Sequence, residues 1–311
     1  MPWDPIVLAR VRHLHLVARI LTDDLMMGEH RSRRVGAAVE FADYQEYLPG
    51  MDLRHLDWRV LARNDRYVVK RFETETQLPC TVVLDLSGDL GTGDAAEQGY
   101  PALEGSKAGY AITLAATLLY WLHRHGEPVG LEIVAGQELL HRSLPPRSGR
   151  NHLQLLFLVL ASARPGGVAD LLPALTTVGG RTRRRSWVAV ITDGMEEPSR
   201  WVGALGAFAR RGTDLRFFHL FDRREWAMDF GTPSLFFSPE GGEPLAVDPH
   251  GAREQLDEVI EEYVAEVRSG VVRWGGQYHL CATDRSMEDT IRRAVAGQGT
   301  QILAGEGAPW R

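Results

Sequence analysis

From residue 80 onward the sequence alternates short apolar runs with longer amphipathic runs, and this alternation limits the possible folds more than any other feature. Short apolar runs predict strands buried on both faces, and the amphipathic runs between them predict helices that cover those faces. Strands that alternate with helices build a mostly parallel sheet. We therefore predict an α/β fold with a doubly wound, mostly parallel sheet.

The individual elements follow from the periods of the apolar residues and from the glycines that end the runs. Strands are expected at residues 80–85, 128–136, 137–144, 186–194, 214–222 and 277–284. Helices are expected at residues 106–126, 151–163, 199–212, 252–272 and 287–297. A Gly/Pro-rich segment at residues 230–249 predicts a hairpin.

The first 78 residues have a different pattern. Residues 4–27 predict an amphipathic helix that Gly28 closes. The segment that follows is polar and arginine-rich, and it contains a Pro-Gly turn and a strand-like run at residues 66–77. We predict two domains: an N-terminal helix with a small β element at residues 1–78, and the α/β domain at residues 79–311.

Charge and hydropathy exclude some classes of partner. The net charge of −6 gives no basic surface for nucleic acid. The most apolar helical run, residues 108–122, is shorter than the roughly 18 residues that cross a bilayer, and no signal segment opens the chain. Cys80 and Cys281 lack zinc-site spacing and are expected to be reduced. We predict a cytoplasmic protein without a membrane span.

Two predicted strands end in acids. Asp85, Ser87 and Asp89 follow one strand at alternate positions, and Asp193 follows another. In a doubly wound sheet, ligands bind beyond the carboxyl ends of the strands, where the strand order reverses. Oxygen donors of this kind suit Mg²⁺, Mn²⁺ or Ca²⁺. We predict a divalent-cation site, although the same residues are also common in turns and helix caps.

A signature region precedes the first of these strands. It contains a glycine, Glu-Phe, a Tyr-x-Pro-Gly turn, an Asp-Trp-Arg core and a strand ending in Phe-Glu. The residues are Gly36, Glu40, Phe41, Tyr47, Pro49, Gly50, Asp52, Arg54, Asp57, Trp58, Arg59, Ala62, Arg63, Val69, Phe72 and Glu73. In these positions the chain resembles the domain of unknown function 58 (DUF58) family, and the resemblance extends over nearly the whole chain.

The resemblance implies a von Willebrand factor A-like domain that works beside a MoxR-type AAA+ ATPase to assemble or activate a client complex. It also implies a metal-ion-dependent adhesion site. Asp85 and Ser87 match the first motif of that site, Asp89 replaces the motif's last serine, and Asp193 matches the later aspartate. The expected middle loop, residues 145–153, offers Ser148 or Asn151 but no threonine.

Arginines and acids interleave densely in the signature region. Guanidinium groups that pair with carboxylates can lock an irregular segment in place, whereas Trp and Arg are also typical interface anchors. Both roles stay open, as a structural clamp or as a partner-docking face. We expect Trp58 to be largely buried. We also expect at least one of Arg54, Arg59 and Arg63 to pair with a carboxylate within residues 40–57. The candidate residues are Arg54, Asp57, Trp58, Arg59 and Arg63.

Two enzymatic functions are alternatives to a protein-interaction module. Residues 91–96 satisfy a Gly-x-Gly-x-x-Ala pattern after a strand, as in nucleotide-binding enzymes. A metal-dependent hydrolase would use the Asp85/Asp193 site, with Asp85 as nucleophile or with a metal-activated water. Lys107 is the cationic residue near that site in sequence. No Ser-His-Asp or Cys-His spacing stands out, and we predict a non-enzymatic interaction module.

Overall fold

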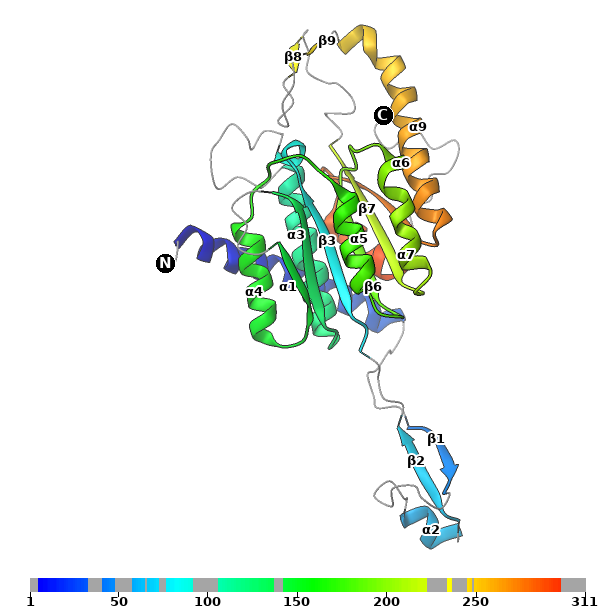
Figure 1. Cartoon of the computed structure of the whole chain (residues 1–311). Helices are drawn as coiled ribbons and strands as arrows, with labels where there is room; N and C mark the ends of the chain where they lie inside the picture. The colour runs from blue at the N-terminus through cyan, green and yellow to red at the C-terminus, as the bar shows by residue number, and fades with distance from the viewer. Residues whose placement is uncertain are drawn as a thin grey trace. The chain divides into compact units, whose positions relative to one another are not determined.

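The computed structural model describes residues 5–32, 41–47, 58–64, 66–72, 77–91, 106–136, 142–222, 234–236, 245–247 and 249–297 (Figure 1). The chain divides into two compact units. Unit 1 comprises Met1–Met26 and Leu78–Arg311, and unit 2 comprises Met27–Gln77. In contrast to the predicted division, most of the N-terminal helix belongs to the unit that contains the large sheet.

Unit 1 is built on a six-stranded sheet in the order β10-β7-β6-β3-β4-β5. All neighbouring strands are parallel except β4 and β5, which are antiparallel. The strands are β3 (Cys80–Leu86), β4 (Val129–Ala135), β5 (Ser143–Arg147), β6 (Trp187–Thr192), β7 (Asp214–Phe221) and β10 (Gln277–Ala282). The predicted mixed α/β fold with a mostly parallel sheet is confirmed.

The order of the strands identifies the place where the chain changes direction across the sheet. Starting from the β5 edge and numbering these strands by their order in the chain, the sheet reads 3-2-1-4-5-6. This is a doubly wound order, in which the strand sequence reverses between the first and fourth strands. The reversal here falls between β3 and β6.

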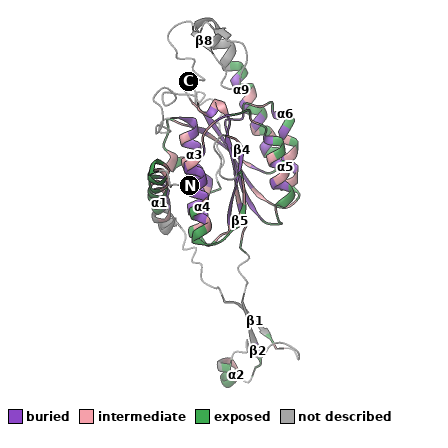
Figure 2. Ribbon diagram, turned by 60° about the vertical axis from the view of Figure 1, so that its left-hand side comes forward, coloured by how far each residue is buried: buried purple, intermediate pink, exposed green. Residues whose placement is uncertain are grey.

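Helices cover both faces of the sheet (Figures 1 and 2). Val82 and Leu84 of β3 belong to one core and Val83 to the other, because successive side chains of a strand point to opposite faces. The first core is covered by α1 (Pro5–Ser32), α3 (Lys107–Arg124), α4 (Arg150–Ser162) and α10 (Met287–Val295). The second is covered by α5 (Leu171–Arg181), α6 (Pro198–Trp201), the 3₁₀ turn η3 (Val202–Leu205), α7 (Gly206–Ala209) and α9 (Pro249–Arg273).

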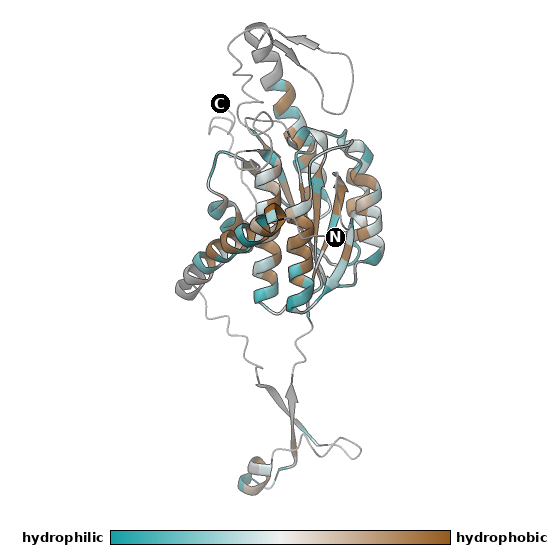
Figure 3. Cartoon of the chain, turned by 90° about the vertical axis from the view of Figure 1, so that its left-hand side faces the viewer, coloured by the Kyte–Doolittle hydropathy of each residue, from teal (hydrophilic) through white to brown (hydrophobic). Residues whose placement is uncertain are grey.

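The helix α1 is amphipathic, as the sequence predicts. Leu14, Ala18 and Leu25 are buried in the first core, whereas Leu16 and Ile20 are exposed. Figure 3 shows apolar and polar residues alternating along this helix. The predicted stop at Gly28 is wrong, because α1 continues to Ser32. A single glycine lowers helix propensity by only about 1 kcal/mol and need not end a helix.

Three other elements differ from the predictions. Helix α5 was missed because its Pro173, Gly179 and Gly180 are poor helix formers. The helix expected at residues 199–212 is broken into α6, η3 and α7. The edge strand β5 covers Ser143–Arg147 rather than residues 137–144, of which residues 137–141 lie outside the described part of the chain.

Unit 2 contains β1 (Phe41–Glu46), the helix α2 (Trp58–Asn64) and β2 (Val68–Phe72). The two strands pair antiparallel, and an exposed ion pair joins Arg66 to Glu46 at 2.9 Å. In unit 1, the hairpin predicted within residues 230–249 is confirmed, since β8 (Ser234–Phe236) pairs antiparallel with β9 (Leu245–Val247).

Three of the candidate residues of the signature region, Trp58, Arg59 and Arg63, lie in α2. Trp58 is 62% exposed, so the predicted burial is wrong. It is the first residue of a short helix, and the elements described in unit 2, two strands and this helix, are too few to enclose an indole ring. Arg54 and Asp57 lie outside the described residues, as does the side chain of Arg59, and Arg63 is exposed. The predicted pairing of these arginines with carboxylates stays a prediction.

Candidate functional site

The strands β3 and β6 lie side by side and end at the same edge of the sheet. They are parallel, and Leu84 of β3 is opposite Ile191 of β6. Asp85 and the pair Thr192-Asp193 therefore meet at the carboxyl ends of the two strands between which the strand order reverses. The sequence predicted this meeting, and it places the candidate site where ligands bind in doubly wound sheets.

Asp85 is 1% exposed, and both of its carboxylate oxygens accept a hydrogen bond. Oδ1 accepts from the backbone N–H of Ser87 at 2.9 Å, and Oδ2 accepts from the hydroxyl of Thr192 at 2.7 Å. Burial, together with the neighbouring carboxylate of Asp193, raises the pKa of Asp85 to about 7, although hydrogen bonds from Thr192 and Ser87 oppose this rise. The surroundings of Asp85 thus favour its protonated form more than water would.

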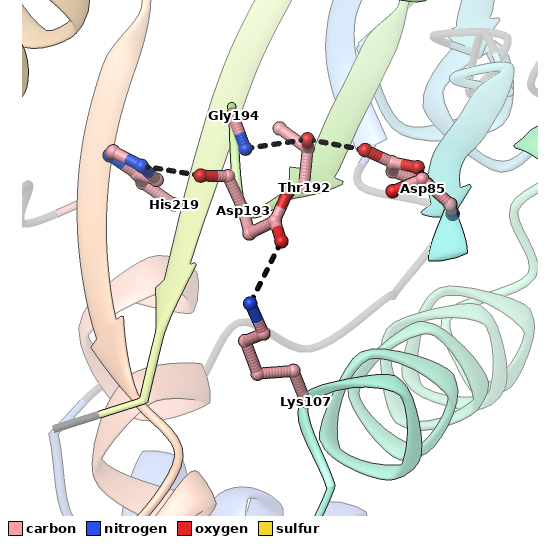
Figure 4. Close-up of polar contacts among 7 residues, drawn as sticks. Asp85, Lys107, Thr192, Asp193, Gly194 and His219 are labelled. Atoms are coloured by element: carbon pink, nitrogen blue, oxygen red, sulfur yellow. Dashed lines mark hydrogen bonds and ion pairs between the residues drawn. The ribbon is translucent and has the colours of Figure 1, made fainter. Parts of the chain in front are cut away.

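Asp193 forms a buried ion pair with a residue far away in the sequence. Its Oδ2 lies 3.0 Å from the ammonium nitrogen of Lys107, and both side chains are 3% exposed (Figure 4). Lys107 is the first residue of α3, which is capped by Ser106 through a hydrogen bond from the N–H of Gly109 to the Ser106 hydroxyl. The other oxygen of Asp193, Oδ1, is buried and has no hydrogen-bond partner among the described residues.

The backbone around Asp193 is held by a buried histidine. His219 of β7 is fully buried, and its Nε2 lies 2.9 Å from the Asp193 carbonyl oxygen (Figure 4). A carbonyl oxygen only accepts, so Nε2 carries the proton and donates to it. Nδ1 then accepts from the hydroxyl of Tyr278 at 2.7 Å. Burial lowers the pKa of His219 to about 4, and the histidine is neutral.

Gly194 completes the turn after β6. Its N–H donates to the Thr192 hydroxyl at 2.9 Å, and its φ of +65° lies in the left-handed region that favours glycine. A Cβ at this position would lie 3.2 Å from Nε2 of His219. Thr192 therefore accepts from Gly194 and donates to Asp85, and it links the two strand ends. The sequence reasoning overlooked Thr192, whose only signal was its position beside Asp193.

The loop that approaches the end of β3 is not the one predicted. Gly166 donates from its N–H to the carbonyl of Leu86, and the N–H of Gly88 donates to the carbonyl of Gly167. The predicted middle loop, with Ser148 and Asn151, instead follows β5. Since β5 is antiparallel to β4 and Arg147 is opposite Val129, that loop begins at the amino edge of the sheet. Its prediction as a ligand loop is wrong.

These contacts do not suit a divalent cation. Both oxygens of Asp85 have donors, and Lys107 occupies one oxygen of Asp193. Ser87 is buried next to Asp85, and Asp89 lies partly exposed in the 3₁₀ turn η2 (Gly88–Gly91). In the part of the chain that the structure describes, no group of three or more His, Cys, Asp or Glu side chains is arranged to hold a metal. The predicted cation site at Asp85, Ser87, Asp89 and Asp193 stays a prediction, which the pairing of Asp193 with Lys107 does not favour.

Other predicted features fall elsewhere. Of the glycine-rich pattern at residues 91–96, only Gly91 is described. Cys80 and Cys281 are free and buried, as expected. Within the described residues, no helix combines the length and the apolarity needed to cross a membrane.

The fold defines the chain as an α/β protein with a polar network at the switch point of a doubly wound sheet. Residues 43–268 match the family described as protein of unknown function DUF58, and the chain belongs to this family. Uncharacterised proteins of Mycobacterium tuberculosis and Mycobacterium bovis are each 27% identical over 306 residues. These alignments cover 97% of this chain and 93% of each relative.

Solved structures give weaker likenesses. The conserved hypothetical protein BatB from Bacteroides thetaiotaomicron is 15% identical with a TM-score of 0.43, and the alignment covers 70% of this chain and 97% of that one. An aerotolerance-related membrane protein from Bacteroides fragilis is 16% identical with a TM-score of 0.39, and the alignment covers 70% of this chain and 96% of that one. An uncharacterised membrane-spanning protein from Vibrio fischeri has a TM-score of 0.22.

These names correct the predicted location. Two of the three structures are named as membrane proteins, so the cytoplasmic location predicted from the sequence is not retained. At these TM-scores the likeness assigns no location of its own to the chain.

Proposed function

We propose that this chain is a non-enzymatic protein-interaction module with a von Willebrand factor A-like domain. Its partner is a MoxR-type AAA+ ATPase, with which it assembles or activates a client protein complex. Membership of the DUF58 family and the doubly wound strand order support this proposal. The observation that carries it is an exposed apolar surface beside a polar network whose charged groups are already paired inside the protein.

That surface, the loop patch, consists of Val168, Leu172 and Met195. Their side chains are 64%, 39% and 59% exposed. Val168 follows Gly167, whose carbonyl accepts from Gly88 after β3. The residues next to Leu172 and Met195 are joined by a hydrogen bond of 2.6 Å from the N–H of Leu171 to Oε1 of Glu196. The loop patch therefore borders the carboxyl edge of the sheet.

An apolar patch suits protein docking better than catalysis. Exposed apolar groups beside a polar site are typical of interaction surfaces, since docking removes them from water. A metal-dependent hydrolase would instead need an accessible nucleophile or an open coordination position. Asp85 and Lys107 are 1% and 2% exposed, and their charged atoms contact protein groups. No contact among the described residues favours the hydrolase.

The loop patch makes the proposal testable by substitution. We expect Val168→Asp and Met195→Asp each to weaken binding to a purified MoxR-type ATPase about tenfold, because each places a charge in an apolar contact. Binding is measured by isothermal titration calorimetry. Val272→Asp is the matched control: Val272 is 54% exposed, but it lies near the end of α9, just before β10 begins at the amino edge of the sheet.

The control separates specific docking from a general effect of surface charge. If Val272→Asp weakens binding as much as the two patch variants do, the loop patch is not the docking surface. If the wild-type chain does not bind the ATPase at all, with nucleotide or without it, the proposed partnership is wrong.

A further inference from the structure

We infer that the ammonium group of Lys107 is the resident cation of the site at the β3 and β6 strand ends, so that Asp193 keeps its charge beside the buried Asp85 without a divalent metal. The inference concerns how the site is built and does not depend on the proposed partner. It follows from where Lys107 lies, from what it contacts and from how rarely the chain uses lysine.

Two carboxylates buried at adjacent strand ends need compensating positive charge. Asp85 and Asp193 are 1% and 3% exposed, and water cannot screen their repulsion. The ammonium of Lys107 contacts Oδ2 of Asp193 at 3.0 Å in a pocket where its own side chain is 3% exposed. A buried charge is tolerated only when it is paired. The network therefore already contains one positive charge.

The position of Lys107 shows that its charge has a specific role. It opens an 18-residue helix, where the positive end of the helix dipole disfavours a cation. It is also one of only two lysines in a chain with 35 lysine and arginine residues. Arginine presents a wide planar fork, whereas lysine ends in a compact point charge. A compact cation at this position takes the role that a metal ion would have beside Asp193.

Removing the ammonium group of Lys107 should leave both carboxylate oxygens of Asp193 available to a metal ion. Asp193 Oδ1 has no hydrogen-bond partner among the described residues, and substitution of Lys107 would also leave Oδ2 without its ammonium partner. A hard divalent cation prefers such unpaired carboxylate oxygens. The wild-type chain should thus ignore divalent cations, and a Lys107→Met chain should bind them.

The experiment compares melting temperatures in MgCl₂, MnCl₂ or CaCl₂ with those in EDTA at equal ionic strength. We expect the wild type to shift by less than about 1 °C, since a ligand stabilises only the state that binds it. Lys107→Met should melt roughly 10 °C lower in EDTA and recover several degrees with a divalent cation. The double variant Lys107→Met/Asp193→Asn should be more stable in EDTA than the single variant, and divalent cations should not shift its melting temperature.

Arg216→Met is the matched control for losing a buried cation. The Arg216 side chain is 9% exposed and pairs with Asp214 at 2.8 Å, but Asp214 is half-exposed and lies at the other end of the sheet. This variant should lose stability without gaining a response to cations. A wild-type shift of several degrees overturns the inference. So does a folded Lys107→Met chain that ignores all three cations.

If Lys107→Met does not fold in either buffer, a spectroscopic measurement tests whether a metal ion binds beside Lys107. In a Lys70→Arg background, Lys107 is the only lysine in the chain. With ¹⁵N-labelled lysine, we expect one slowly exchanging ammonium signal that millimolar Mn²⁺ leaves sharp. Broadening of that signal by Mn²⁺ would place a metal beside Lys107 and overturn the inference.

Discussion

At the scale of single residues, His219 shows how burial makes stability depend on pH. Its imidazole is fully buried and neutral, and its pKa is lowered to about 4 by desolvation, with Lys107 adding to the effect. In the unfolded chain the pKa returns to its ordinary value near 6.5. Between these two values the unfolded state binds a proton that the folded state does not bind. The free energy of unfolding therefore falls as the pH drops from about 6.5 to about 4.

We predict that His219→Gln removes this part of the pH dependence. The glutamine amide can still donate to the Asp193 carbonyl, so the variant loses some stability at pH 7.5 through altered packing. At pH 5 the difference in free energy of unfolding between wild type and variant should be about 2 kcal/mol smaller than at pH 7.5. Urea denaturation at the two pH values measures this gap. Asp85 and His279 also titrate here, but they are common to both chains. An unchanged gap would contradict the assignment of His219.

The residues of the site were only partly predictable from the sequence. Asp85 and Asp193 end two apolar runs, and parallel strands bring such ends together, so their meeting followed from the pattern. The sequence also singled out Lys107 as the cationic residue near the site, but not its burial or its pairing with Asp193, which lies 86 residues away. Lysine usually faces solvent, so the sequence alone gives no reason to expect a buried ammonium group here.

At the scale of elements, the contact between β4 and β5 depends on a glycine. A Cβ on Gly130 would lie 2.6 Å from the nitrogen of Pro146 and 2.7 Å from the carbonyl oxygen of Leu144. Both atoms belong to the backbone of β5 and cannot move without shifting the strand. The antiparallel edge strand can therefore lie this close only because Gly130 has no side chain.

We predict that Gly130→Ala destabilises the chain by roughly 1–3 kcal/mol, the usual cost of forcing atoms into a packed site. Gly180→Ala is the control, because a Cβ there would meet nothing within 4 Å and alanine favours the helix α5. Its stability should be equal or slightly higher. Chemical denaturation measures both. Equal stability of Gly130→Ala and wild type would mean that β5 pairs less closely than the structure shows.

Elements were predictable where local pattern and tertiary packing agree. The strand β3 is apolar from Val82 to Leu84 and is buried on both faces, so its pattern and its environment coincide. Helix α5 has weak helix formers, and it is helical because Leu171, Leu175 and Val178 pack into the second core. Gly179 also lets α5 lie close to Ala207, because a Cβ on Gly179 would be only 3.1 Å from the Cβ of Ala207. Such packing cannot be inferred from propensity alone.

At the scale of the whole molecule, both hydrophobic cores that the described residues form lie in unit 1. The residues of both cores of unit 1 come from α1 and from residues 78 onward, and no side chain described within residues 27–77 belongs to either core. Unit 2 has the exposed side chains of Trp58 and Tyr67, at 62% and 57%. Exposed aromatic residues are frequent anchors of protein interfaces. Trp58 and Tyr67 are therefore candidates for a second docking surface in unit 2, in addition to the loop patch of unit 1.

We predict that replacing residues 33–77 with a Gly/Ser linker leaves unit 1 folded. A linker of about 20 residues reaches about 25 Å on average and keeps α1 covalently joined to β3. The melting temperature should stay within a few degrees of that of the full chain, because no residue of either core is lost. A fall of more than about 10 °C, well beyond the effect of one lost core contact, would show that unit 2 contributes to the stability of unit 1.

Trp58→Ala in the full chain is the companion variant. It should leave the melting temperature unchanged. Weaker binding of this variant to the ATPase would then assign the signature region to docking rather than to a structural clamp.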